Sequence, residues 1–204
     1  LSNLDAKLRN QMRAELIKLR QRIDTTFIYV THDQTEAMTL GDRIVIMKDG
    51  FIQQVGTPQQ VFDHPANLFV AGFIGTPQMN FFDGSLVKHD GRYFIETDGL
   101  SVELSEDKQQ RLAAKDVAEQ QVTVGVRPEH VIIGQSGIPA KVDVSEMMGS
   151  SVHLHMSALG GDMIAIVPLN GEAAHYPMGM DVKLSFGGHV VHVFSKDDSK
   201  NLEW

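Results

Sequence analysis

The first part of the chain moves from a helical to an extended pattern of apolar residues. Apolar side chains recur at spacings of three and four, with charges between them, at Leu4, Leu8, Met12, Leu16, Leu19 and Ile23. This period predicts an amphipathic helix over residues 4–22, with Ser2 or Asn3 as its N-cap. Residues 25–31 are β-branched and aromatic without polar alternation. They predict a strand that is buried on both faces and ends at His32 and Asp33.

Short elements follow up to about residue 75. Residues 34–40 predict a short helix that Gly41 stops. Apolar segments at 43–47 and 51–55 flank Lys48-Asp49-Gly50, a sequence typical of a hairpin turn. Thr57 before Pro58 predicts an N-cap with proline at the first helical position, opening a helix that ends near residue 63. Residues 67–74 form one more short apolar segment.

The pattern changes after Gly75-Thr76-Pro77, from helical period to short strands between turn residues. We therefore expect two units, residues 1–75 and 76–204. The second is predicted to contain one helix, at 105–114, and strands at 81–88, 92–97, 100–104, 121–127, 130–133, 138–147, 151–158, 162–168 and 181–194. Many short strands at this spacing are typical of a small barrel or sandwich rather than a parallel sheet.

Charge is distributed unevenly along the chain, whose net charge is −8. Residues 1–75 carry eight basic and eight acidic side chains, whereas residues 76–204 carry ten basic and eighteen acidic ones. An acidic domain repels a phosphate backbone, so we expect no nucleic-acid partner. The sequence has no cysteine, which excludes disulfides and thiolate metal sites. Its apolar runs are far shorter than the roughly 18 residues that span a bilayer.

His32 is the first candidate for chemistry, because it stands where a buried strand is predicted to end and ligands often meet α/β sheets at that point. Its imidazole can donate a hydrogen bond to a phosphate oxygen. The alternative is a histidine that only completes a turn or caps the helix at 34–40. Asp5, at the entrance formed with Ser2, Asn3 and Leu4, is suited either to a nucleotide or partner contact or to simple complementation of the helix dipole.

Several motifs resemble those of one known family. The segment Leu1-Ser2-Asn3-Leu4-Asp5-Ala6-Lys7-Leu8-Arg9 resembles the D-loop of ABC ATPases, and Thr31-His32-Asp33-Gln34 with Glu36-Ala37-Met38 resembles their switch-histidine segment. The residues Gly56-Thr57-Pro58, Pro65, Asn67, Phe69-Val70-Ala71, Phe73-Ile74-Gly75 and Met79-Asn80-Phe81 are similar to the linker of maltose-type carbohydrate importers. Gly125-Val126-Arg127-Pro128-Glu129-His130 and the closing Asn201-Leu202-Glu203-Trp204 resemble that subfamily's regulatory domain.

This resemblance implies an α/β remnant of an ABC nucleotide-binding domain followed by an all-β, oligonucleotide-binding-type barrel that regulates it. It implies that His32 reads the γ-phosphate of ATP, and that Ser2, Asn3, Leu4 and Asp5 contact nucleotide or a second subunit. The parent would be an ATPase that uses ATP and Mg and powers carbohydrate import from the inner face of the cell membrane. Its implied partners are a second copy of itself, transmembrane permease subunits and a regulatory protein.

The chain nevertheless contains no G-x-x-x-x-G-K-[ST] phosphate loop, glutamine loop, LSGGQ signature or Walker B strand. Because it opens on Leu1, we expect it to be truncated and these segments to precede it. Without them the electrostatic clamp for phosphoryl transfer is incomplete. We therefore expect this chain alone to be inactive and to bind no cofactor.

The second unit holds weaker candidates. His153 and His155 lie two apart on a predicted strand and share one face, but the sequence offers no third ligand, so we expect no metal site. Arg127, Glu129 and His130 surround Pro128 and form either a charge network that fixes a turn or a ligand site. Oxyanion binding by this unit is an alternative function, although its acidic balance disfavours it. Apolar strands at 163–167 and 190–194 are candidates for a two-fold dimer contact.

Overall fold

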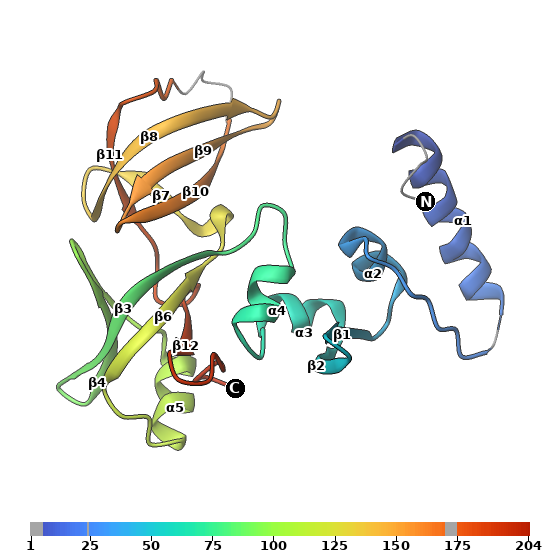
Figure 1. Cartoon of the computed structure of the whole chain (residues 1–204), viewed down its shortest axis with the longest axis horizontal. Coiled ribbons are helices and arrows are strands. Elements are labelled where there is room, and N and C mark those ends of the chain that lie inside the picture. Colours follow the sequence, from blue (N-terminus) through green and yellow to red (C-terminus); the bar gives the residue numbers. More distant parts are fainter. Residues whose placement is uncertain (1–5, 24, 170–174) are drawn as a thin grey trace. The chain divides into compact units, whose positions relative to one another are not determined.

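The structure is a computed structural model that describes residues 6–23, 25–169 and 175–204. It divides into two compact units, Leu1–Pro65 and Ala66–Trp204 (Figure 1). In the part of the chain that is described, no helix has both the length and the apolar character needed to cross a membrane. The predicted N-cap at Ser2 or Asn3 lies outside the described residues, as does Asn170-Gly171, a dipeptide that predicts a turn.

Most elements of the first unit are those that the sequence predicts. They are helices α1 (Ala6–Arg22), α2 (Gln34–Leu40) and α3 (Pro58–Asp63), and the hairpin strands β1 (Ile44–Lys48) and β2 (Phe51–Gly56). Thr57 caps α3 through a capping box, in which its side chain and that of Gln60 each accept a hydrogen bond from the other's backbone. The hairpin turns at Asp49 and Gly50, which both have positive φ.

The prediction of a strand at residues 25–31 is wrong. The segment is extended but has no strand assignment, and its apolar side chains are exposed, with Ile28 at 85% and Val30 at 91%. A buried strand needs ladder partners at its edges and packing on both faces. In the described part of this unit, β1 and β2 pair with each other, and no strand pairs with residues 25–31. The local pattern is that of a buried strand, but the described residues contain no neighbouring strand that pairs with it.

The second unit begins ten residues before the predicted boundary at 75. Helix α4 (Leu68–Phe73) belongs to this unit because it is attached to the end of the chain. The Leu68 amide donates to the Ser199 carbonyl at 2.9 Å. Ala71 packs with Met79 and Phe194 in a small buried cluster. The contacts with Ser199 and Phe194 join residues more than a hundred positions apart, so a local change of pattern does not reveal them.

Two five-stranded antiparallel sheets make up most of the second unit. The first has the order β12-β6-β3-β4-β5 and the second the order β10-β9-β8-β11-β7 (Figure 1). The strands are β3 (Asn80–His89), β4 (Arg92–Thr97), β5 (Leu100–Glu103), β6 (Gln120–Val126), β7 (Ile132–Gly134), β8 (Ile138–Met147), β9 (Ser151–Ala158), β10 (Gly161–Pro168), β11 (Asp181–Ser185) and β12 (His192–Ser195). Helix α5 (Glu106–Ala114) follows β5, and a 3₁₀ turn, η1 (Pro128–His130), follows β6. This confirms the predicted all-β, barrel-like second unit.

The two sheets share one hydrophobic core. Alternate residues of β9 are buried, as expected of a strand with one face inward, and residues such as Leu86 and Leu154 bring the sheets together. The same core contains Met163, Ala165 and Val193, all at most 1% exposed. The apolar residues of 163–167 and 190–194 therefore mainly fill the subunit's own interior. This corrects the expectation that they form a dimer contact.

The single strand predicted at 181–194 is two strands, β11 and β12, which belong to different sheets. The chain turns between them, where the Val190 amide donates to the Gly187 carbonyl. At Gly188 a Cβ atom would lie 1.9 Å from the carbonyl oxygen of Glu103, so only glycine fits. Gly188 thus marks a close backbone approach rather than the middle of a strand.

The chain end fastens α5 to the first sheet. The Lys108 ammonium lies 2.5 Å from the Glu203 carboxylate, and both side chains are almost completely buried. Glu203 also accepts a hydrogen bond from the Val193 amide at 3.2 Å. Next to this pair, the Arg111 guanidinium lies over the Trp204 ring, 3.4 Å from its centre. The buried ion pair makes the last residues part of the folded core.

Candidate functional site: the turn that carries His32

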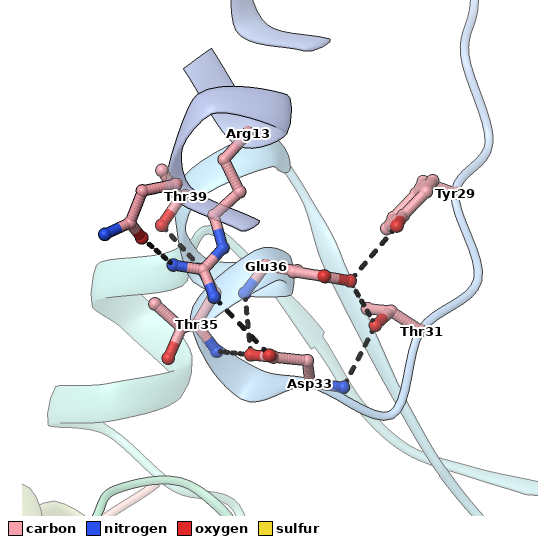
Figure 2. Close-up of polar contacts among 8 residues, drawn as sticks. Arg13, Tyr29, Thr31, Asp33, Thr35, Glu36 and Thr39 are labelled. Atoms are coloured by element: carbon pink, nitrogen blue, oxygen red, sulfur yellow. Dashed lines mark hydrogen bonds and ion pairs between the residues drawn. The ribbon is translucent and has the colours of Figure 1, made fainter. Parts of the chain in front are cut away.

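His32 lies in a bend between the extended segment and helix α2, and its side chain is exposed. The residue after it, Asp33, is the N-cap of α2. Its Oδ1 accepts hydrogen bonds from the amides of Thr35 at 2.8 Å and Glu36 at 3.1 Å (Figure 2). The cap therefore fixes the backbone directly after His32 to the helix.

The residue before His32 is fixed as well. Thr31 Oγ1 accepts a hydrogen bond from the Asp33 amide at 3.0 Å and donates one to Glu36 Oε2 at 2.6 Å (Figure 2). The Tyr29 hydroxyl donates to the same carboxylate oxygen at 3.1 Å. Burial, followed by the nearby Glu36 carboxylate, raises the pKa of Tyr29. Side-chain bonds thus hold the backbone on both sides of an exposed imidazole.

Glu36 is the buried member of this cluster, at 2% exposed. Its Oε2 accepts both hydroxyl bonds, while its Oε1 is buried without a hydrogen-bond partner. Leu40, one turn further along α2, is buried on the same face. A carboxylate among buried positions is costly unless it is well paired, so its place here calls for a functional or positional reason.

Helix α1 is tied to both ends of α2 by arginines. The Arg13 guanidinium lies 3.5 Å from the Asp33 carboxylate and also donates to Asn10 on its own helix. Seven residues on, Arg20 donates to the Leu40 carbonyl and pairs with the Asp42 carboxylate at 3.0 Å. The first of these contacts, drawn in Figure 2, connects α1 directly to the turn that carries His32.

The sequence makes His32 a candidate but does not predict the residues that hold its turn in place. Arg13, Tyr29 and Glu36 are not candidates in the sequence, because their role depends on contacts between separate elements. One signal was present: Glu36 and Leu40 are four apart, so the sequence places a carboxylate on the apolar face of a predicted helix. The other predicted residues of this site, Ser2, Asn3, Leu4 and Asp5, lie outside the described residues.

The three residues around Pro128 differ in environment. Arg127 is 2% exposed, and its Nη1 donates to the Ile74 carbonyl at 2.8 Å, at the end of α4. Glu129 is exposed, and His130 is half-buried with an Nδ1 atom that has no hydrogen-bond partner. Arg127 therefore serves to attach α4 to the sheet, which is a structural role.

A groove of about 630 Å³ opens between the two sheets. Its lining includes His155 and three carboxylates, from Asp143, Glu146 and Asp162. The His155 imidazole lies 3.2 Å from the Glu146 carboxylate. In the described residues, no three His, Cys, Asp or Glu side chains are placed to hold a metal ion. The carboxylates also make the groove unfavourable for an oxyanion.

Asn80 joins the sheets at the floor of this groove. Its side-chain amide donates to the Ile164 carbonyl at 2.8 Å, and its Oδ1 accepts from the Ile164 amide at 2.7 Å. The side chain thus acts as a short piece of β-ladder between β3 and β10. A structural amide therefore occupies part of the groove's lining.

Two family models of known domains match sequence in the second unit. The MalK OB fold domain matches residues 75–131, and the TOBE domain matches residues 124–194. A solved structure, the cytoplasmic molybdate-binding protein ModG with molybdate bound, covers 55% of this chain and 92% of its own, at 14% identity and a TM-score of 0.43.

The relatives that are similar over nearly all of this chain are ABC transporter ATP-binding proteins. The uncharacterized ABC transporter ATP-binding protein YurJ of Bacillus subtilis is 48% identical, over 94% of this chain and 53% of YurJ. The oligosaccharides import ATP-binding protein MsmX of the same organism is 50% identical, over 97% of this chain and 54% of MsmX. The chain spans about half the length of these curated relatives. By these matches the homologues of this chain are ABC transporter ATP-binding proteins, and the chain contains a MalK OB fold domain and a TOBE domain.

Proposed function

We propose that this chain is the part of a carbohydrate importer's ATPase subunit that carries the switch histidine and the regulatory β unit. Residues 1–65 would complete an α/β nucleotide-binding domain whose phosphate loop, signature and Walker B segments are supplied by further sequence. Residues 66–204 would form the regulatory unit. The observation that carries the proposal is the exposed His32 side chain on a turn held from both sides.

The described residues of the turn fit part of an ATP site. His32 is exposed and can donate a hydrogen bond to a phosphate oxygen, whereas the carboxylates of Asp33 and Glu36 are occupied by bonds within the protein. ATP with Mg would supply the phosphoryl group to be hydrolysed. His32 would read the γ-phosphate and orient the attacking water, and Asp5 with Ser2, Asn3 and Leu4 would contact the nucleotide or the second subunit.

The carbohydrate part of the proposal rests on MsmX, whose name describes oligosaccharide import. By analogy we place the subunit in the cytoplasm, on the inner face of the membrane, bound to transmembrane permease subunits. A regulatory protein bound to the β unit is a further proposed partner. Two copies would pair to form the ATP sandwich.

Import can be tested in Bacillus subtilis cells that lack MsmX. A chimera is made in which the part of MsmX that this chain does not match precedes Leu1. We expect the chimera to restore growth on oligosaccharides that require MsmX, because the chain would supply the missing turn and regulatory unit. The His32→Ala chimera should not restore growth. The matched control is His89→Ala, an exposed histidine of the second unit that pairs with Glu96.

Growth that depends on the chimera but not on His32 would contradict the role given to this residue. A chimera that accumulates normally, hydrolyses ATP and still fails to support growth would contradict the assignment to carbohydrate import.

Pairing of two subunits can be tested separately by sedimentation of the purified chain. Each copy has a net charge of −8, so repulsion between copies opposes a dimer, and salt screens that repulsion. We expect a dimer that is tighter at about 0.5 M than at about 0.05 M NaCl. A chain that remains monomeric at high concentration in both buffers would argue against pairing through this chain.

A further inference from the structure

Side-chain hydrogen bonds hold the turn at residues 31–36 on both sides of His32. Thr31 is bound to Glu36, and Asp33 is bound to the first amides of α2. His32 stands between these two anchored residues, yet its own side chain is exposed. The backbone of the turn therefore has one preferred position, while the imidazole remains accessible to a ligand.

We propose that Glu36 is a positioning residue for His32, and that Arg13 ties helix α1 to the same turn. This inference rests on the proposed function, because a positioned imidazole matters only if it meets a substrate. Glu36 acts through Thr31 and Tyr29 and does not touch the nucleotide. Arg13 acts through Asp33.

The burial of Glu36 supports a positional role. An apolar residue on this face of α2 would avoid the desolvation cost of a carboxylate, as Leu40 does one turn later. Both hydroxyl donors to Glu36 come from the extended segment, which has no strand partner in the described residues. These two bonds therefore attach that segment to α2 in place of a backbone ladder.

The charge of Arg13 supports the same arrangement. Its side chain is mostly buried, at 17% exposed, and lies across from Asp33, the residue that both caps α2 and follows His32. A displacement of α1 would strain this ion pair, and through Asp33 it would move the turn. The side chains thus connect α1, the turn and α2 as one local unit.

The first experiment uses the purified chain and hydrogen exchange of the Asp33 amide, which donates to Thr31 Oγ1. Glu36→Ala removes the acceptor that orients Thr31, so we expect exchange of this amide to become about tenfold faster. Glu36→Gln keeps an oxygen acceptor and should change the rate less than about twofold. Glu15→Ala, an exposed carboxylate of α1, is the matched control and should have no effect.

The second experiment uses ATP hydrolysis by the chimera described above. A misplaced His32 should lower kcat about tenfold while leaving KM for ATP nearly unchanged, because the phosphate loop provides most of the binding. Glu36→Gln should restore most of the lost kcat. Thr31→Val removes the hydroxyl that binds both Glu36 and the Asp33 amide and retains the shape of the side chain, so it should reproduce the effect if Glu36→Ala fails to fold.

The outcomes separate this inference from the proposed function. Unchanged Asp33 exchange in Glu36→Ala would overturn the local arrangement. If Glu36→Ala showed faster Asp33 exchange but an unchanged kcat, the positioning role would be overturned. A loss of activity in His32→Ala would in that case still support the proposed function. If His32→Ala itself hydrolysed ATP normally, the proposed function would fail first, and the exchange result would still report on the local arrangement.

Discussion

Replacing Lys108 by methionine should destabilise the second unit by about 3–5 kcal/mol, because it leaves the Glu203 carboxylate buried without its counter-ion. Glu203 is 2% exposed and keeps only neutral donors, such as the Val193 amide. Chemical denaturation of the purified chain measures this loss. The matched control is Lys141→Met, an exposed lysine of β8, which should change stability by less than about 0.5 kcal/mol.

The double variant Lys108→Met, Glu203→Gln should recover most of this loss, since glutamine has no charge to compensate and still accepts from Val193. If the double variant were as unstable as Lys108→Met alone, the loss would come from packing and not from the unpaired charge. If Lys108→Met were as stable as Lys141→Met, the ion pair would not matter to the fold.

The loss should also depend on pH. Burial raises the pKa of Glu203, and Lys108 opposes that shift. Without Lys108 the pKa in the folded state rises further above the unfolded value. The carboxyl is neutral in both states at low pH, and as pH increases the unfolded state ionises first. Stability must therefore fall as pH rises from the unfolded pKa to the folded one. Lys108→Met should be more destabilising at about pH 8 than at about pH 5.

Much of this fold follows from local sequence. The hairpin at Asp49 and Gly50, the capped helix after Thr57 and most strands of the second unit have boundaries within one or two residues of those predicted. Each depends on turn chemistry or on alternation within a few residues. Such features are determined by the residues themselves.

The failures depend on distant residues. Residues 25–31 have the composition of a buried strand, but a strand requires partners. The break at Gly188 arises from the approach of Glu103, far away in sequence. Helix α4 joins the second unit through residues near the chain end, such as Ser199. Sequence pattern alone contains none of these contacts.

The same distinction applies to the candidate site. A short motif is enough to make His32 a candidate, but the sequence also allows His32 as the cap of the helix at 34–40, whereas the cap in the structure is Asp33. The contribution of Glu36 and Arg13 appears only when the extended segment, α1 and α2 are brought together. Likewise, the sequence predicts either a charge network or a ligand site at Arg127, and only the contact with Ile74 in the structure reveals a structural attachment.

Under the proposed function, His32 serves ATP hydrolysis only when the chain is joined to the phosphate-binding part of the subunit. Phosphate release from Mg-ATP by the purified chimera tests this most directly. A residue that orients the attacking water typically contributes at least about 100-fold. We therefore expect His32→Ala to lower kcat by about that factor, and His89→Ala to leave it unchanged.

The chain without the added segment should release no phosphate above its own His32→Ala variant. One hydrogen bond to phosphate, worth about 1.5–3 kcal/mol, cannot offset the cost of immobilising the nucleotide. An active chimera that is insensitive to His32→Ala, or hydrolysis by the chain alone that depends on His32, would contradict the role proposed for His32.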